Sequence, residues 1–296
     1  METGMVGYIG AMPELKDAEF RRLSKFIQTN YGIKMPLTKR VVLQGRLQKR
    51  LKALSMRDFK EYADYVFSPA GKEEIIHMID VVSTNKTDFF REPSHFVYLS
   101  NNILPALAKE QRYRKVNVWS AGCSSGEEPY TLAMVMSEFC EKNYGMDYSI
   151  LATDISTLML QQGADAIYRE DRIIPVPAFM RSKYLMRSKD QKVQNVRIVK
   201  HLRDKIQFRR LNFMDSTYPV GFDFDIIFCR NALIYFERQD QENIINKLVQ
   251  HLKPGGYFIL GHSETITNMN VPLESIGSTI YRKRTIINEQ PNEYID

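Results

Sequence analysis

The stretch Val116–Thr131, VNVWSAGCSSGEEPYT, gives the strongest indication of the fold of this chain. A short β-branched and apolar run ends at small residues, the glycines Gly122 and Gly126 follow, and a helical segment opens with EEP at 127–129. Glycine allows the backbone to turn sharply and to come close to a ligand, and proline suits a first helical turn. The stretch therefore predicts a strand, a tight turn and the start of a helix.

The chemistry of this turn narrows the class of ligand. A helix N-terminus offers free N–H groups and a partial positive charge, which favour a nucleotide-like ligand. A dinucleotide fingerprint requires three glycines at fixed spacing, and only Gly122 and Gly126 are present. Glu127 and Glu128 would repel a pyrophosphate, but they suit a sulfonium nucleoside such as S-adenosylmethionine. An ordinary βα turn is the alternative from this stretch alone.

Composition bounds the class of protein. The 296 residues are enough for one large or two modest domains, and 44% of them are hydrophobic. The net charge of +6 favours an acidic partner surface without establishing nucleic acid. The three cysteines show no metal-ligand spacing. No apolar run approaches the roughly 18 residues of a membrane span, and no signal-peptide pattern opens the chain. We therefore expect a cytoplasmic protein without membrane insertion, with loose ends at residues 1–12 and from Asn288.

Residues 1–83 are predicted to form a helical domain, because their apolar residues recur at helical spacing. Thr38 is expected to cap the second helix, which runs to about Ala53. Ser55 is a candidate cap for the next helix, through Phe67.

One helix of this domain carries cations without acids. No acid occurs from Lys34 to Arg57. At about 100° per residue, Lys39, Arg46 and Arg50 project within a narrow sector, which Arg57 joins only if the helix is unbroken. Surface faces usually mix charge signs, so the stripe favours an acidic partner, and a solvated helix face is the alternative. Lys39, Arg46, Arg50 and Arg57 are therefore candidate docking residues.

Residues 84–114 are predicted to be a loop and a helix that precede an α/β domain beginning at Lys115. The loop reads TNKTDFFREP and is rich in hydrogen-bonding groups, so it is a candidate lid. Phe89 and Phe90 argue against a plain linker, because a linker has no use for two large apolar side chains. Residues 96–107 are expected to be helical.

Polar residues follow two strands of the α/β domain. The second strand, YSILAT, ends at Asp154, where an acid can accept hydrogen bonds from ribose hydroxyls. IIFC at 226–229 is a continuous apolar run, which is typical of a central parallel strand. Because ligands bind at the carboxyl ends of such strands, Arg230, Asn231 and Tyr235 are site candidates, and an ordinary βα loop is the alternative.

The segment at about 172–210 departs from the alternation of strands and helices. It contains two prolines, then the alternating stretch VQNVRIV from Val193, then Ile206–Arg209. We expect a small antiparallel β-subdomain inserted into the parallel sheet. The last edge strand of the sheet is expected at Ser278–Arg282.

Five motifs, in order and spacing, resemble the bacterial chemotaxis receptor glutamate O-methyltransferases, the CheR family. They are TNKTDFFRE at 84–92, WSAGCSSGEEPYT at 119–131, LATDIS at 151–156, FCRNALIYF at 228–236 and LKPGGYFILGHSE at 252–264. The resemblance covers nearly the whole chain. It implies an α/β fold of the class I S-adenosylmethionine-dependent methyltransferases, with a Rossmann-like sheet in 115–296, the N-terminal all-helical domain and the inserted antiparallel β-subdomain.

The resemblance also implies the site residues. Those expected to bind the cofactor are Asn85, Thr87, Arg91, Glu128, Asp154, Asn212, Phe213, Asn231 and Ala232. Arg91 and Tyr235 are implied as catalytic residues, placed where the methyl group is transferred. Many class I methyltransferases read acid-x-Gly-x-Gly-x-Gly at the first turn, whereas residues 120–126 read SAGCSSG here. Glu128 must therefore supply an acid from the helix side.

The implied reaction transfers the methyl group to glutamate side chains of chemotaxis receptors in sensory adaptation, with S-adenosylhomocysteine as the second product. A glutamate carboxylate with a pKa near ~4.3 is ionised at neutral pH, so no general base is required and no metal is expected. The receptor methylation regions are acidic helical bundles, which suit the docking residues. In some family members the subdomain binds a receptor C-terminal peptide, but the corresponding Arg187–Gln194 lacks glycines here.

Two other classes of protein stay open. A nucleic-acid methyltransferase of the same fold fits the pI of about 9.0. Against it, no basic patch interleaved with exposed aromatics and no RNA module is visible, so no nucleic-acid partner is expected. A non-catalytic binding module would keep the cofactor pocket without turnover, and the presence of Arg91 and Tyr235 argues against it.

Overall fold

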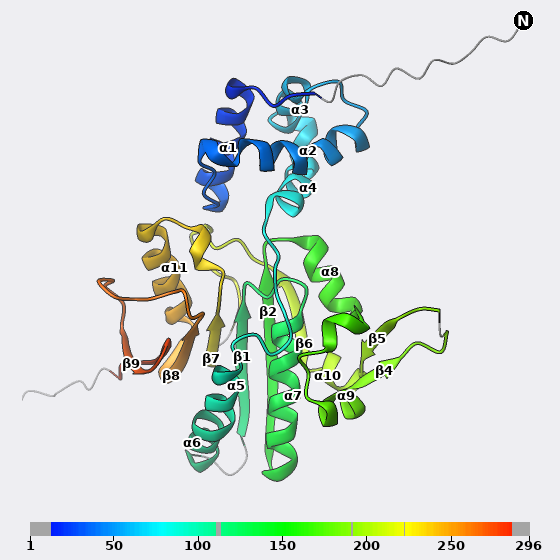
Figure 1. Cartoon of the computed structure of the whole chain (residues 1–296). Helices are drawn as coiled ribbons and strands as arrows, with labels where there is room; N and C mark the ends of the chain where they lie inside the picture. The colour runs from blue at the N-terminus through cyan, green and yellow to red at the C-terminus, as the bar shows by residue number, and fades with distance from the viewer. Residues whose placement is uncertain (1–12, 111–113, 191, 222, 286–296) are drawn as a thin grey trace, which may run out of the picture. The chain divides into compact units, whose positions relative to one another are not determined.

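The computed structural model describes residues 13–110, 114–190, 192–221 and 223–285 (Figure 1). The chain divides into two compact units, Met1–Ser83 and Thr84–Asp296. The loose ends expected at residues 1–12 and from Asn288 lie outside the described residues.

The first unit is helical. Its elements are α1 (Asp17–Tyr31), η1 (Leu37–Lys39), α2 (Arg40–Ala53), α3 (Phe59–Val66), η2 (Pro69–Gly71) and α4 (Lys72–Val82). Leu43, Leu47 and Leu51 recur every fourth residue on α2 and are buried. One face of α2 therefore supplies the core of this unit.

The two predicted helix caps in this unit are wrong. Thr38 lies inside η1, and the N-cap of α2, Lys39, makes no side-chain hydrogen bond. The cap of α3 is Asp58, whose carboxylate accepts from the N–H of Glu61 at 2.8 Å. A capping residue requires an extended backbone, which Asp58 has, whereas Ser55 is left-handed with φ 55°.

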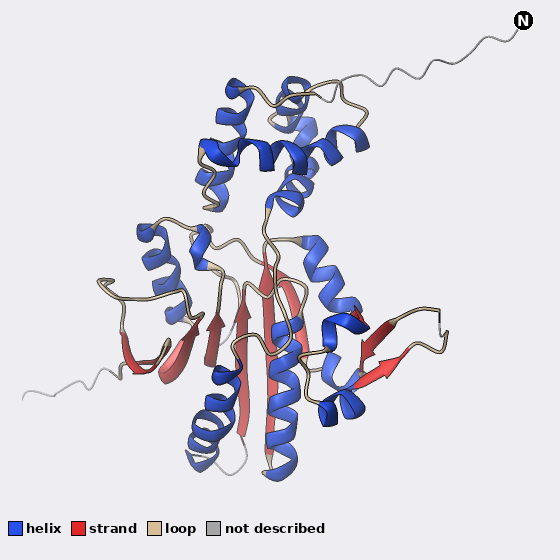
Figure 2. Ribbon diagram, in the orientation of Figure 1, coloured by secondary structure: helices blue, strands red, loops and turns tan. Residues whose placement is uncertain are grey.

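The second unit is built on a mixed sheet that, in the described residues, has seven strands in the order β6-β2-β1-β7-β8-β10-β9 (Figures 1 and 2). The strands are β1 (Arg114–Ala121), β2 (Met146–Asp154), β6 (Ile206–Arg210), β7 (Phe224–Cys229), β8 (Leu252–Leu260), β9 (Leu273–Gly277) and β10 (Ile280–Lys283). The first five in spatial order are parallel, whereas β10 runs antiparallel to both of its neighbours, β8 and β9. After β1 the chain adds β2 and β6 on one side of it, and then β7 and β8 on the other side. In such sheets ligands bind where the direction of strand addition reverses, which here is between β1 and β7.

The helices of this unit cover both faces of the sheet, except that α9 packs on the inserted subdomain (Figure 1). They are α5 (Pro93–Tyr98), α6 (Leu104–Glu110), α7 (Glu127–Lys142), α8 (Thr157–Asp165), α9 (Ala178–Tyr184), α10 (Lys200–Arg203) and α11 (Arg238–Gln250). The predicted central strand β7 is buried at every residue, with Ile226 and Phe228 in one core cluster and Ile227 and Cys229 in the other. Across the described part of the chain, no helix combines the length and the hydrophobicity that a membrane span requires.

The helix expected at 96–107 is present, but its hydrogen-bond pattern changes from α to π and back within it. α5 and α6 are joined by a π-helical turn, η3 (Leu99–Ile103). Pro105 is the second residue after this turn and lacks the N–H that a regular α-helix would use. The wider π turn therefore lies where the proline interrupts the regular hydrogen-bond ladder.

The inserted subdomain is confirmed as antiparallel, but its predicted bounds need correction. Its described strands are β3 (Ile167–Arg169), β4 (Leu185–Arg187) and β5 (Asn195–Ile198), in the order β3-β5-β4. The subdomain sheet thus begins before residue 172. Ile206–Arg210 is not part of it, because this strand pairs in parallel with β2 at the edge of the main sheet. An edge strand is only half buried, so its sequence resembles that of a hairpin strand.

The strand predicted at Ser278–Arg282 is present as β10, but it is not the edge of the sheet. β10 lies between β8 and β9, and β9 is the edge strand in the described sheet. The sequence of β9, LESIG, has two exposed residues in its middle and no apolar run. The sequence of β9 therefore lacks the apolar pattern from which a strand is predicted.

Candidate functional site

The turn after β1 brings the backbone against two other loops. Gly122 (φ 84°) and Gly126 (φ 94°) adopt left-handed conformations, and so does Ser124 (φ 47°). A Cβ atom on Gly122 would lie 2.8 Å from the Cβ of Ala232 and 3.8 Å from the Cζ of Phe213. Glycine is thus required at 122 by its backbone angle and by space. Two predicted cofactor residues, Phe213 and Ala232, therefore meet at this turn.

Asp154 is fixed at the carboxyl ends of β1 and β2. Its Oδ2 accepts from the N–H of Ser124 at 2.8 Å, and its Oδ1 accepts from the N–H of Ser156 at 2.9 Å. β1 and β2 pair in parallel up to Ala121 and Thr153, so the residues that follow them are neighbours. The acid lies where the sequence predicted it, beside the glycine turn.

The two acids that begin α7 have different surroundings. Glu127 is 1% exposed and pairs with Arg172 at 2.9 Å. Glu128 accepts from the Ser120 hydroxyl at 2.7 Å and pairs with Arg230 at 3.2 Å. Burial raises the pKa of Glu128, and the charge of Arg230 offsets this in part. The carboxylate of Glu127 is buried and binds groups of the protein itself. The side chain of the predicted cofactor residue Glu128 is 13% exposed.

Arg230 lies at the centre of the site, directly after β7. It donates to Glu128 at 3.2 Å, to Glu92 at 3.1 Å and to the carbonyl of Arg91. The amide of Asn231 donates to the other oxygen of Glu92 at 3.1 Å. Burial alone would raise the pKa of Glu92, but the Asn231 hydrogen bond and the Arg230 charge outweigh it, so the pKa is lowered. The end of β7 thus holds the segment that contains Arg91.

The candidate lid, residues 84–92, is anchored on the α/β unit. The carbonyl of Asn85 accepts from the Ser124 hydroxyl at 3.1 Å. Phe89 is 1% exposed, and its ring packs edge-on against Tyr168 with centroids 4.9 Å apart. The apolar side chain therefore anchors the loop, as expected from the argument against a plain linker.

Asn212 and Phe213 follow the edge strand β6. The side-chain oxygen of Asn212 accepts from the N–H of Met214 at 3.1 Å. The ring of Phe213 packs 6.0 Å from that of Phe236, measured between centroids. This loop therefore reaches the turn after β1, as the contact of Phe213 with position 122 also indicates.

The implied catalytic residues lie on segments that the structure joins. The Arg91 guanidinium donates to the carbonyl of Lys86 at 3.1 Å and is half-buried. Tyr235 ends the short helix η5 (Leu233–Tyr235) and packs, half-buried, against the core. Arg230 binds the backbone of Arg91 and precedes η5 by three residues. The two side chains therefore belong to segments that meet at the carboxyl end of the central strand β7.

Sequence reasoning missed three charged residues of the site. Arg172 donates to the carbonyl of Thr87 and pairs with Asp88 at 3.2 Å. Glu92 binds Arg230 as described above. The Glu264 carboxylate accepts, at 2.8 Å each, from the N–H groups of Asn231, Leu233 and Gly261. Two of these residues, Glu92 and Glu264, belong to the motifs at 84–92 and 252–264. Their hydrogen-bond partners lie in distant segments of the chain, and a single sequence does not indicate which distant segments meet.

Glu92, His95 and His262 offer side-chain donor atoms that lie within 4.8 Å of one another. Both oxygens of Glu92, however, already accept hydrogen bonds, one from Arg230 and one from Asn231. A cation bound there would face the Arg230 guanidinium directly. The donor set therefore fits an internal hydrogen-bond network better than a metal site.

Two of the docking candidates, Arg46 and Arg50, bind other residues of the helical unit. Arg50 binds Glu74 of α4 through two hydrogen bonds of 2.8 and 2.7 Å, and the Glu74 side chain is 3% exposed. Arg46 donates to the carbonyls of Val82 and Ser83 at the end of α4. The expected single-sign stripe is therefore wrong at Arg50, because the matching acid comes from another helix.

The other two docking candidates are less constrained. Lys39 donates to the carbonyl of Lys34 at 3.3 Å. Arg57 lies beyond the end of α2 and is 86% exposed at its side chain, with Glu61 at 3.3 Å. Because the helix breaks before it, Arg57 does not share the sector of the α2 cations.

The sheet order, the glycine turn after β1 and the Asp154 carboxylate at the end of β2 define a class I S-adenosylmethionine-dependent methyltransferase fold. The chain belongs to the CheR methyltransferase family: residues 85–282 match its SAM binding domain and residues 18–83 match its all-alpha domain. These matches confirm the resemblance seen in the five motifs.

Relatives with assigned names agree with the family match. The chain is 41% identical over 269 residues to the chemotaxis protein methyltransferase of Borreliella burgdorferi, covering 90% of this chain and 94% of that one. It is 34% identical over 267 residues to the chemotaxis protein methyltransferase of Escherichia coli, covering 90% and 91%. The likeness thus extends over both units.

Proposed function

We propose that this protein transfers the methyl group of S-adenosylmethionine to glutamate side chains of chemotaxis receptors, forming glutamyl methyl esters. The family match supports the cofactor, and the names of the relatives support a substrate in chemotaxis. One observation carries the proposal. Glu128, Asp154 and Asn231 lie together with the loop 84–92 at the carboxyl ends of the parallel strands β1, β2 and β7.

The residues present fit the cofactor. Asp154 is the proposed acceptor for the ribose hydroxyls, and Glu128 is the proposed acid for the positively charged methionine end. The absence of a side chain at Gly122 lets Ala232 lie directly against the glycine turn, with Phe213 beside it, so two proposed cofactor residues are brought to this turn. When bound, S-adenosylmethionine supplies an electrophilic methyl group on a sulfonium centre.

The protein's part in the reaction is alignment and exclusion of water. A glutamate carboxylate is ionised at neutral pH, since its ordinary pKa is near ~4.3. Arg91 is proposed to steer this carboxylate, and Tyr235 to position it by a hydrogen bond. Neither residue has to change its protonation state. The anchored loop 84–92 supports a site that holds its reactants in fixed geometry.

The proposed docking face accepts the acidic helices of a receptor. Half-buried Lys39 and exposed Arg57 are the cleanest probes of it, because Arg50 pairs with buried Glu74 and its reversal would unfold the helical unit. The double variant Lys39→Glu/Arg57→Glu should slow methylation sharply while the affinity for S-adenosylhomocysteine stays unchanged. An unchanged methylation rate would remove these cations from the docking proposal.

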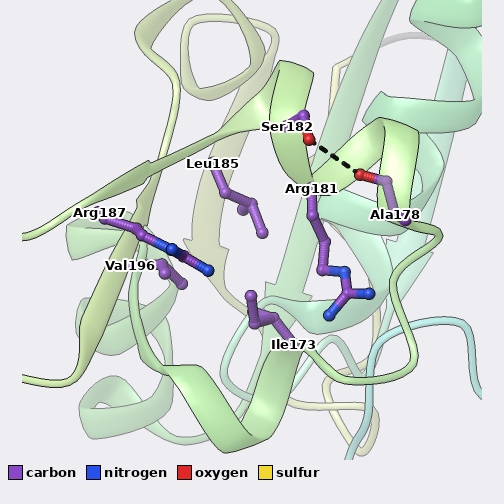
Figure 3. Close-up of a pocket in the computed structure, with 7 residues that line it drawn as sticks. All are labelled: Ile173, Ala178, Arg181, Ser182, Leu185, Arg187 and Val196. Atoms are coloured by element: carbon purple, nitrogen blue, oxygen red, sulfur yellow. Dashed lines mark hydrogen bonds between the residues drawn. The ribbon is translucent and has the colours of Figure 1, made fainter.

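The β-subdomain is a second proposed receptor contact, through a receptor C-terminal peptide. It contains a cavity of about 460 Å³ whose apolar lining includes Ile173, Leu185 and Val196 (Figure 3). Arg181 and Arg187 line the same cavity from α9 and β4. An apolar lining with two cations suits a peptide that carries a carboxylate beside an apolar side chain.

The test is methyl transfer from labelled S-adenosylmethionine to receptor-containing membranes. Carboxyl methyl esters hydrolyse in mild alkali and N-methyl groups do not, so the label is scored as base-labile counts. Base-labile label that is lost in Arg91→Ala and Tyr235→Phe supports the proposal. Label that enters nucleic acid, or tight cofactor binding with no transfer to any receptor, contradicts it.

A further inference from the structure

We propose that Arg172 and Arg230 are positioning residues that hold the loop 84–92 in its cofactor-binding conformation. Each arginine joins the loop to one acid of the Glu127–Glu128 pair. The inference rests on the proposed function, because it concerns the same cofactor site. It adds two residues outside the expected cofactor set, one of which belongs to the β-subdomain segment.

Arg172 forms the first of these links. It lies on the short helix η4 (Glu170–Ile173), next to the strand β3. Its Nη2 donates to Glu127 at 2.9 Å and to the carbonyl of Thr87, and its Nη1 lies 3.2 Å from the carboxylate of Asp88. One guanidinium therefore binds an acid of α7, a loop carbonyl and the loop carboxylate that follows that carbonyl.

Arg230 repeats the pattern from the opposite end of the loop. Its Nη1 donates to Glu128 at 3.2 Å, and its Nη2 donates to the carbonyl of Arg91 and to Glu92 at 3.1 Å. Again the three partners are an α7 acid, a loop carbonyl and the next carboxylate in the loop. We call these two sets of contacts the arginine clamps.

The two adjacent acids make this arrangement possible. Consecutive residues on a helix point about 100° apart, so Glu127 and Glu128 reach different partners. A planar guanidinium presents several donors in a fixed fork and binds two or three acceptors at once, which an ammonium does not do. The clamps bracket residues 87–92, a span that includes buried Phe89 and the proposed catalytic residue Arg91. Their contacts therefore set the position of the loop backbone on both sides of Arg91.

Arg172 offers the clearer test, because its side chain is 40% exposed and that of Arg230 is 2% exposed. The variants are Arg172→Gln and Arg172→Lys in the full chain. The matched control is Arg169→Gln, three residues earlier, whose side chain is 75% exposed and pairs with Asp171. The measurements are the Kd of S-adenosylhomocysteine by calorimetry, the rate of tryptic cleavage after Lys86, and the Tm without ligand.

Arg172→Gln should raise the Kd about tenfold, as expected for the loss of a charge-assisted hydrogen bond, and should speed cleavage after Lys86, which is exposed in the loop. Arg172→Lys should restore only part of the affinity, because it keeps the charge and loses the fork. Arg169→Gln should match the unmodified protein. In Arg230→Lys, cleavage should also be faster.

The proposal is overturned if Arg172→Gln keeps its Kd within about twofold and its cleavage rate unchanged, or if Arg172→Lys recovers full affinity. A fall in Tm with an unchanged Kd would assign the arginine a merely structural role and would also overturn it. Because neither binding nor cleavage needs a receptor, these results stand apart from the methyl-transfer test. If the arginine variants change the Kd and the cleavage rate as expected but no methyl transfer is detected, only the proposed function is contradicted.

Discussion

The N–H of Ser124 donates to the Asp154 carboxylate at 2.8 Å, so one acid at the end of β2 fixes the glycine turn after β1. Ser124 adopts a left-handed conformation with φ 47°, which is uncommon for a residue other than glycine. The hydrogen bond helps to hold this conformation. The acid and the turn, which lie 30 residues apart in the sequence, therefore act as one structural element.

Gly122→Ala should abolish detectable binding of S-adenosylhomocysteine. The added Cβ would lie 2.8 Å from the Cβ of Ala232, on a backbone with φ 84°. The control is Gly221→Ala, with φ 86° and open space around its Cβ. Both substitutions should cost about 1–2 kcal/mol of stability from the backbone angle, measured by denaturant unfolding. Calorimetry should show lost affinity in the first variant alone, and equal affinities would contradict the close approach at 122.

Arg50→Met should destabilise the helical unit by about 3 kcal/mol, because it leaves the buried carboxylate of Glu74 without its ion-pair partner. Arg57→Met is the control, since its side chain is 86% exposed and its pair with Glu61 lies on the surface. A solvent-exposed pair of this kind is screened by water and contributes little to stability. The free energies of unfolding in urea measure both. Equal losses would show that the Arg50 pair behaves as a surface pair.

The pH dependence of stability should contain a contribution from His95. Burial and the charge of Arg230 lower the pKa of His95 to about 4, with Glu92 opposing and His262 adding to the shift. The ordinary pKa is about 6.5, so between these values the unfolded chain binds a proton that the folded chain does not. Stability from this residue is complete above about pH 6.5 and is lost as the pH falls, by about 2 kcal/mol at pH ~5.

His95→Asn tests this contribution. Urea unfolding of the variant and of the unmodified protein is compared at about pH 7 and pH 5. The variant is expected to lose less stability between the two pH values, by about 2 kcal/mol. Parallel losses in both proteins would show that His95 takes up its proton equally in the folded and unfolded chains.

Cofactor affinity should fall at mildly acidic pH because of Glu128. Burial raises the pKa of this carboxylate, so as the pH decreases it is protonated earlier than an ordinary glutamate and loses its attraction for a cationic ligand. Glu128→Gln should bind S-adenosylmethionine at least about tenfold more weakly at neutral pH and with a flatter pH profile. Calorimetry between about pH 8 and pH 5 measures both. A profile that Glu128→Gln leaves unchanged would remove Glu128 from the cofactor site.

The sequence determined the elements that depend on local pattern. The apolar run at 226–229 predicts the central strand β7, which is buried throughout. The stretch Val116–Thr131 predicts the strand, the glycine turn and the start of α7, because backbone angles at glycine and apolar alternation are local properties. Asp154 was predicted at the end of β2 for the same reason.

Which charged side chains meet depends on the tertiary structure. Glu74 neutralises Arg50 from another helix, and Arg172 and Arg230 reach the two acids of α7 from positions 45 and 102 residues away. The pairing of β6 with β2 rather than with the subdomain is of the same kind. Side-chain pairing across the fold depends on distance in space, and one sequence without its relatives gives no measure of that distance. The local pattern therefore fixed where the site is, and packing fixed which residues hold it together.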